Sequence, residues 1–304
     1  MDTPGDPGAP VWRGLDQAAL DNAYDQRRHA PNWEHVLDRM ATNSVLLRSY
    51  IGDPQSFSYG SSPIERLLFY PATTDAPIHV HIHGGGWRQS KAENMLFLAE
   101  AFLNAGVGFA AVDFTAVDET NGDLEPVVAQ VCRGLIWLAR NAGDLGASAD
   151  RLYVSGVSSG AHLAAVAMTT DWGSYGFSGN PYKGAVLVSG LYDLHPVRLS
   201  KRSQYVTFSD EIEERMSPQR HVGLIDLPII LAYGTLEAPE YQRQTRDFAD
   251  ALTRAGKPVQ HFLCKGYNHF EIAELLGNPC SPLGRAAIAQ ATGMPHERAD
   301  LRRR

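Results

Sequence analysis

Cysteine is scarce in this sequence: only three of its 304 residues are cysteines, at positions 132, 264 and 280. An odd number of widely spaced cysteines excludes a disulfide-stapled scaffold and is typical of a reducing compartment, so we expect a cytoplasmic location. Long apolar runs are also absent, since none approaches the roughly 20 residues that a membrane-spanning helix needs. We therefore expect no membrane partner.

Positive charge is in the minority, with 27 Lys and Arg against 34 Asp and Glu and a net charge of −7. Because a negative chain is poorly matched to a phosphate backbone, we expect no nucleic-acid partner. The first residues are acidic and rich in proline and glycine, which fits neither a signal peptide nor an amphipathic anchor. We expect a disordered lead over residues 1–14.

Short apolar segments alternate with helical patterns along the rest of the chain. Strands are predicted over residues 66–71, 77–83, 107–114, 152–155, 184–189, 228–234 and 259–264. This alternation predicts a single α/β domain over residues 15–304, with a mostly parallel central sheet and helices on both faces. Two segments lie outside this alternation. Residues 15–55 have a helical pattern, and we expect them to form an N-terminal cap. Residues 191–227 show no strand pattern, and we expect them to form a lid-like insertion.

One stretch in the middle of the chain provides the main evidence for a function. A short apolar strand runs into Gly156-Val157-Ser158-Ser159-Gly160 and then into a helix rich in small residues. This is the G-x-S-x-G nucleophile elbow, in which a sharp strand-to-helix turn lifts a serine hydroxyl above the edge of the sheet. The sequence therefore predicts Ser158 as a catalytic nucleophile.

A second glycine-rich motif, His83-Gly84-Gly85-Gly86-Trp87, directly follows a predicted buried strand. It matches the loop whose backbone N–H groups form the oxyanion hole of lipases and esterases, and we expect Gly85, Gly86 and Ser159 to supply the donors. A phosphate-binding loop is the alternative, but its G-x-G-x-x-G and G-K-[ST] patterns are missing.

Three histidines at positions 79, 81 and 83 alternate on the same predicted strand. They suggest a metal site, but no carboxylate or cysteine lies nearby at ligand spacing. We therefore expect no metal and no cofactor.

In this arrangement the acid and the histidine follow the serine along the chain, on loops after later strands. Glu237 comes directly after the strand over residues 228–234, while Glu240 lies at the start of a helix and is the weaker candidate. His269 lies on the loop after the last predicted strand, whereas His261 lies within that strand and is expected to be structural. The predicted catalytic set is Ser158, Glu237 and His269.

With these residues in place, the chain resembles the kynurenine formamidase (arylformamidase) branch of the α/β-hydrolases, close to the hormone-sensitive-lipase-like esterases. The resemblance covers roughly residues 15–275, and residues 189–197 (SGLYDLHPV) and 237–244 (EAPEYQRQ) are its discriminating stretches. Formamidases often have other residues where Gly86, Val157 and Ser159 stand, and an asparagine-containing stretch where residues 201–206 stand. These departures lie around the pocket, so they bear on the substrate more than on the mechanism.

The motifs and the resemblance imply a serine hydrolase that cleaves a small amide, formamide or ester bond on an aromatic substrate through an acyl-enzyme. A carboxylesterase or aryl carbamate hydrolase is the alternative, and a catalytically inactive binding protein is a third possibility. The candidates for an aromatic substrate pocket, each with packing as its alternative role, are Trp87, Tyr175, Tyr205 and Phe208. The sequence leaves a homodimer open.

Overall fold

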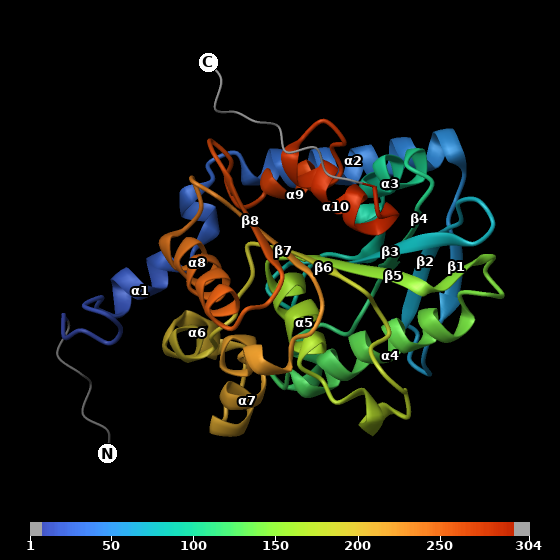
Figure 1. Cartoon of the computed structure of the whole chain (residues 1–304). Coiled ribbons are helices and arrows are strands. Elements are labelled where there is room, and N and C mark those ends of the chain that lie inside the picture. The colour runs from blue at the N-terminus through green and yellow to red at the C-terminus, as the bar shows by residue number, and fades with distance from the viewer. Residues whose placement is uncertain (1–7, 295–304) are drawn as a thin grey trace.

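A computed structural model describes residues 8–294, and its centre is one eight-stranded sheet (Figure 1). The strands lie in the order β1-β2-β4-β3-β5-β6-β7-β8. Pairing from β4 to β8 is parallel, while β1 and β2 are antiparallel to their neighbours. Their bounds are β1 Gln55–Ser58, β2 Arg66–Tyr70, β3 Ala76–Ile82, β4 Gly108–Val112, β5 Ala147–Val157, β6 Ala185–Val188, β7 Ile229–Gly234 and β8 Val259–Cys264. The predicted mostly parallel α/β sheet is confirmed.

Helices cover both faces of this sheet, as the sequence predicts (Figure 1). The α-helices are α1 Gln17–Ala23, α2 Trp33–Ile51, α3 Ala99–Asn104, α4 Glu125–Asn141, α5 Ser159–Met168, α6 His195–Leu199, α7 Asp210–Arg215, α8 Pro239–Arg254, α9 Ile272–Leu276 and α10 Pro282–Thr292. Apolar side chains of α1, α4, α5 and α8 pack on one face, and those of α2, α3, α9 and α10 on the other. The 3₁₀-helices are η1 Gln26–His29, η2 Ala92–Leu98, η3 Val117–Thr120, η4 Trp172–Tyr175, η5 Lys201–Gln204 and η6 Pro218–Leu224. No helix within residues 8–294 combines the length and hydropathy of a membrane span.

The edge strand β1 is not predicted by the sequence pattern, which assigns its first residue, Gln55, to the N-terminal helices. Its four residues are polar apart from Phe57, and most of them are exposed. An exposed edge strand has no buried face, so it carries no alternating apolar pattern.

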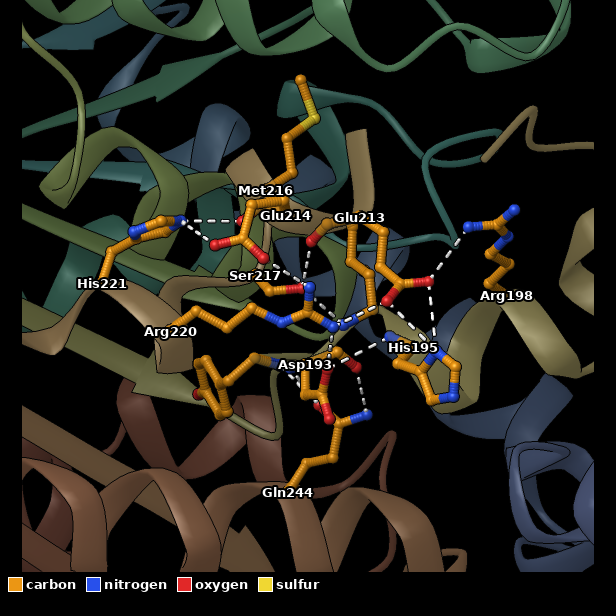
Figure 2. A network of polar contacts seen from close by, with 12 residues as sticks. Asp193, His195, Arg198, Glu213, Glu214, Met216, Ser217, Arg220, His221 and Gln244 are labelled. Atoms are coloured by element: carbon orange, nitrogen blue, oxygen red, sulfur yellow. Dashed lines mark hydrogen bonds and ion pairs between the residues drawn. The ribbon is translucent and has the colours of Figure 1, made fainter. Parts of the chain in front are cut away.

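The segment over residues 191–227 has no strand and forms α6, η5, α7 and η6. Figure 2 shows the polar network that holds it together around Glu213, whose side chain is buried. That carboxylate accepts hydrogen bonds from His195 at 3.1 Å and from Arg220 at 2.7 Å, and it also contacts Arg198 at 3.3 Å. The segment is therefore a folded, internally paired layer, and its η6 packs against α5 and α8.

The N-terminal segment contacts this layer. The Gln17 side chain donates to Leu199 O at 2.9 Å, and Asp21 accepts from the Lys201 N–H at 2.6 Å. Of the lead expected to be disordered, residues 1–7 lie outside the described residues. The prediction is wrong for residues 11–14, because Trp12 pairs with Leu15 through backbone hydrogen bonds and packs on His195 with ring centroids 5.5 Å apart.

Candidate active site

Ser158 stands alone between the end of β5 and the start of α5. Its φ of 57° and ψ of −123° are a strained combination for a residue with a side chain, and they turn the chain sharply from strand to helix. Glycine is required on both sides: a Cβ on Gly156 would overlap the Gly160 backbone, and a Cβ on Gly160 would overlap the carbonyl of Ile82. The strand-turn-helix context of the predicted elbow is present.

The structure brings the predicted acid and histidine together. His269 Nδ1 lies 3.0 Å from Glu237 Oε2, and both side chains are buried. The other carboxylate oxygen, Oε1, accepts hydrogen bonds from the Ser189 hydroxyl and the Gly234 N–H, each at 2.6 Å. Three loops that follow β6, β7 and β8 therefore converge on one carboxylate, whose orientation is fixed by donors on both oxygens.

Glu240, the alternative acid, has different partners. Arg243 donates to its two oxygens at 2.8 and 2.7 Å, and the Tyr24 hydroxyl donates to Oε2 at 3.1 Å. Gln244 in turn donates to that tyrosine hydroxyl at 2.7 Å. Glu240 thus joins the N-terminal segment to α8 and leaves Glu237 as the carboxylate that contacts the histidine.

Tyr241 on α8 connects the histidine to the serine. Its ring meets the His269 ring edge-on with centroids 4.7 Å apart, and its phenol lies within hydrogen-bonding reach of the Ser158 hydroxyl. Burial raises the pKa of Tyr241, while the neighbouring Arg202 guanidinium opposes that increase. The phenol is therefore uncharged near neutral pH, and it can donate a hydrogen bond to the serine.

The loop after β3 lies against the elbow. A Cβ on Gly84 would come within 2.8 Å of Val157 O and 3.2 Å of Ser158 Cβ. Gly85 and Gly86 have φ values of 103° and 66°, in the left-handed region that glycine tolerates best. Among the described residues their N–H groups donate to no protein acceptor. These two groups can therefore bind an oxyanion beside Ser158.

Ser159, the third predicted donor, is the first residue of α5, where a backbone N–H has no partner within the helix. Its hydroxyl accepts from the Trp87 N–H at 3.1 Å and so ties the glycine loop to the helix. The Trp87 side chain is fully buried, and its Nε1 donates to His162 Nδ1 at 3.2 Å. Trp87 accordingly supports the loop from beneath.

The three alternating histidines are core residues. His79 and His81 are fully buried and share the Ser155 hydroxyl at 2.7 and 2.9 Å. His79 stacks on Phe102 at 3.9 Å between centroids, and burial lowers its pKa to about 3. His83 stacks on Phe114 at 4.2 Å. Within residues 8–294 no three His, Cys, Asp or Glu side chains gather into a metal-binding group.

The other aromatic candidates differ in position. The Tyr205 hydroxyl accepts from Arg202 at 2.6 Å, so Tyr205 lies at the site. Tyr175 does not, because it belongs to η4 beyond the far end of α5, where it packs near Trp172. A ten-residue helix spans about 15 Å, so proximity in sequence to Ser158 is misleading there. Phe208 is partly buried against the hydrophobic core, and its place in the pocket stays a prediction.

Arg202 on η5 is the residue that the sequence reasoning missed. Its Nη1 donates to the Tyr205 hydroxyl and its Nη2 to the Tyr241 hydroxyl, each at 2.6 Å. A Cβ on Gly86 would lie 3.3 Å from Nη1. The guanidinium therefore borders both the glycine loop and the phenol that reaches Ser158. Nothing in the local sequence indicates this, apart from the departure of residues 201–206 from the family pattern.

Comparison with known proteins gives consistent relatives. A family model described as BD-FAE matches residues 68–187. The kynurenine formamidase of Salmo salar is 31% identical over 288 residues, covering 87% of this chain and 93% of that protein. The kynurenine formamidase of Danio rerio is 28% identical with the same coverage. An isoprenylcysteine alpha-carbonyl methylesterase of Arabidopsis thaliana is 24% identical and covers 72% of this chain and 56% of its own length.

Solved structures share the fold at low sequence identity. A putative thioesterase from Silicibacter sp. TM1040 has a TM-score of 0.77 and 20% identity, covering 90% of this chain and 98% of that one. The esterase LipW from Mycobacterium marinum has a TM-score of 0.67 and 18% identity, covering 92% and 94%. At such identities the likeness establishes the α/β-hydrolase fold alone.

Proposed function

The chain belongs to the kynurenine formamidase family of α/β-hydrolases, which act on amide or ester bonds, and we propose that it is a serine hydrolase that cleaves a small amide, formamide or ester on an aromatic substrate. The observation that carries this proposal is the buried Glu237–His269 hydrogen bond of 3.0 Å beside the Ser158 elbow. All steps use this chain's own side chains and backbone, so the proposal needs no cofactor.

The first step transfers the Ser158 proton to His269 Nε2 as the serine oxygen attacks the substrate carbonyl carbon. Because His269 Nδ1 donates to Glu237, the proton on that nitrogen is fixed and Nε2 is left free to accept. The imidazolium that forms is stabilised by the carboxylate. The orientation of the Glu237 carboxylate is fixed because the Ser189 hydroxyl and the Gly234 N–H donate hydrogen bonds to its other oxygen.

The tetrahedral intermediate carries a negative oxygen, which the N–H groups of Gly85, Gly86 and Ser159 can bind. Each such donor is worth about 2.7–4 kcal/mol of transition-state stabilisation. Their positions are set before the substrate arrives, because the glycine loop is tied to α5 through Ser159. Preorganised donors need no rearrangement when the charge develops.

His269 then returns the proton to the leaving nitrogen or oxygen, and an acyl group remains on Ser158. Water attacks this acyl-enzyme with the same histidine as base, and the acid is released. The Tyr241 ring lies against His269, and the hydroxyls of Tyr205 and Tyr241 share the Arg202 guanidinium, so two phenol rings at the site support an aromatic substrate.

Ester hydrolysis on a related aryl substrate is the second candidate. The plant methylesterases among the relatives favour it, as do the departures from the formamidase pattern at Gly86, Val157 and Ser159.

The cysteines within residues 8–294 are all free, which supports the expected cytoplasmic location. A homodimer stays a prediction.

A panel of substrates tests the function. We expect N-formyl anilines, aryl acetates and aryl carbamates to be hydrolysed with different kcat/KM values, each with a burst of leaving group when deacylation is slow. Formyl anilines as the best series would support the formamidase, and aryl acetates as the best series the esterase. Absence of turnover on the whole panel, with folded protein, would contradict the proposed function.

A further inference from the structure

The charge of Arg202 is not balanced by a carboxylate. Among the described residues, its hydrogen-bond partners are the phenols of Tyr205 and Tyr241, and no Asp or Glu forms an ion pair with it. Phenols are uncharged near neutral pH, and burial raises the pKa of Tyr241 further. A partly buried cation without an anion is unfavourable, so a bound anion would stabilise it.

Neighbouring arginines are paired. Figure 2 shows Arg198 and Arg220 lying against Glu213 in the same segment. Arg243, which also lies near the N-terminal segment, contacts Glu240 and Asp247, each at 2.7 Å. The other arginines of residues 191–227 are thus each paired with a carboxylate, Arg215 with Glu125 of α4, and Arg202 differs from them in having no such partner.

The Arg202 guanidinium also has N–H groups that donate to no acceptor among the described residues. It has five N–H groups, and only two donate to the tyrosine hydroxyls. Its Nε is buried and has no hydrogen-bond partner in the described part of the chain. Besides this buried group, one N–H on Nη1 and one on Nη2 remain, and the fork geometry of a guanidinium suits a carboxylate that accepts two parallel hydrogen bonds.

The surroundings indicate the rest of the ligand. The guanidinium carbon lies 5.8 Å from the Trp87 ring centroid and 5.9 Å from that of Tyr241, so aromatic rings flank it. A separate surface cavity of about 290 Å³, lined by Tyr205, Arg88 and Asp118 among others, does not include Arg202 in its lining. The flanking rings suit an aromatic substrate that places its reacting carbonyl at Ser158.

We propose that Arg202 binds a carboxylate of the substrate and selects aryl amides or esters that carry one, a specificity that rests on the proposed hydrolase function. One guanidinium supplies one positive charge, which matches a carboxylate better than a doubly charged phosphate. The net charge of −7 makes this local cation the feature that admits an anion to the site.

A pair of substrates of equal size tests the proposal: 3-formamidobenzoate, which is an anion, and 3-formamidobenzamide, which is neutral. For the unmodified protein we expect kcat/KM to favour the anion by roughly 10²-fold, as is typical when a desolvated charge pair is made. Arg202→Gln should bring this ratio close to one, and Arg202→Lys should leave an intermediate ratio. A ratio below about threefold in the unmodified protein would overturn the proposal, whatever the variants do.

Arg88→Gln is the matched control. Arg88 lies over the Tyr205 ring at 4.4 Å, but it is paired with Asp118 at 2.6 Å. Its loss removes one positive charge near the site without touching the proposed carboxylate position, so the substrate ratio should persist. An equal fall of the ratio in Arg88→Gln would attribute the preference to general charge and overturn the assignment to Arg202.

Calorimetric binding of benzoate and benzamide separates this proposal from the hydrolase function. Benzoate should bind at least tenfold more weakly to folded Arg202→Gln, with benzamide unchanged. If benzoate binds more weakly to Arg202→Gln than to the unmodified protein but no substrate is turned over, the proposed hydrolase function is wrong and the carboxylate site is supported. Equal benzoate binding to both proteins overturns the site, as does binding of inorganic phosphate in preference to benzoate.

Discussion

Replacing Glu237 by glutamine tests how the histidine is oriented. The glutamate accepts from His269 through Oε2 and from Ser189 and the Gly234 N–H through Oε1. A glutamine amide must turn its NH₂ group toward one of these sides. Facing Gly234, it would set two donors against each other and leave a buried N–H unpaired, at about 1–3 kcal/mol. The amide is therefore expected to turn its NH₂ group toward His269.

In that orientation His269 Nδ1 must accept, so its proton moves to Nε2 and the ring can no longer take the proton of Ser158. Loss of the correct tautomer lowers kcat by about 10⁴ in a serine triad, or about 5 kcal/mol at 1.36 kcal/mol per decade. Steady-state kinetics on 4-nitrophenyl acetate and urea unfolding provide the two readouts. We expect the large fall in kcat with little change in the free energy of unfolding.

Glu240→Gln is the matched control, three residues further on. It weakens the buried pair with Arg243, which keeps Asp247 as a partner, so we expect a loss of stability of about 2 kcal/mol. This exceeds the fraction of a kcal/mol that a carboxylate at a helix start would contribute. Activity should stay within tenfold of the unmodified protein. A 10⁴-fold loss in Glu240→Gln with full activity in Glu237→Gln would refute the assignment.

Three further predictions concern the elbow, the phenol and the buried histidines. Gly160→Ala should prevent folding or cost more than about 4 kcal/mol in urea unfolding, because its Cβ would overlap a carbonyl at the end of β3; a stable variant would contradict the packing. Tyr241→Phe should slow acylation of Ser158 about tenfold in pre-steady-state kinetics, since the neutral hydrogen bond to the serine is lost together with the contact to Arg202; an unchanged rate would remove the phenol from the site. Burial lowers the pKa of His162 to about 4, below its usual 6.5, so the unfolded state binds this proton first as pH falls. The free energy of unfolding should therefore fall between pH 6.5 and 4, by about 2 kcal/mol at pH 5 from this residue, and a smaller acid sensitivity in His162→Gln checks it.

The elbow and the acid–histidine pair could be predicted because their position follows from chain order. In a parallel sheet the carboxyl ends of the strands meet at one edge, so residues after β5, β7 and β8 must lie close together. The motif letters around Ser158 then fix a strained turn that only glycine permits on either side. Local pattern and topology were sufficient for this part of the site.

Side-chain contacts made by the N-terminal segment and by residues 191–227 were not predictable in this way. Arg202 meets Tyr241 across 39 positions and Tyr24 meets Glu240 across 216, with no periodic signal at either end. Tyr175 shows the converse error, because a residue near the elbow in sequence is moved away by α5. The edge strand β1 was not predicted because it has no buried face and therefore no alternating apolar pattern.

Covalent labelling of Ser158 tests the central claim most directly. The protein is treated with an organophosphate, and intact mass and peptide mass spectra are recorded for the unmodified protein and for Ser158→Ala. We expect one adduct on the peptide that contains Ser158 and none in the variant, with turnover falling to the roughly 10³-fold rate over water that binding and the oxyanion hole provide. An adduct on another residue, or near-normal turnover by Ser158→Ala, would contradict the account.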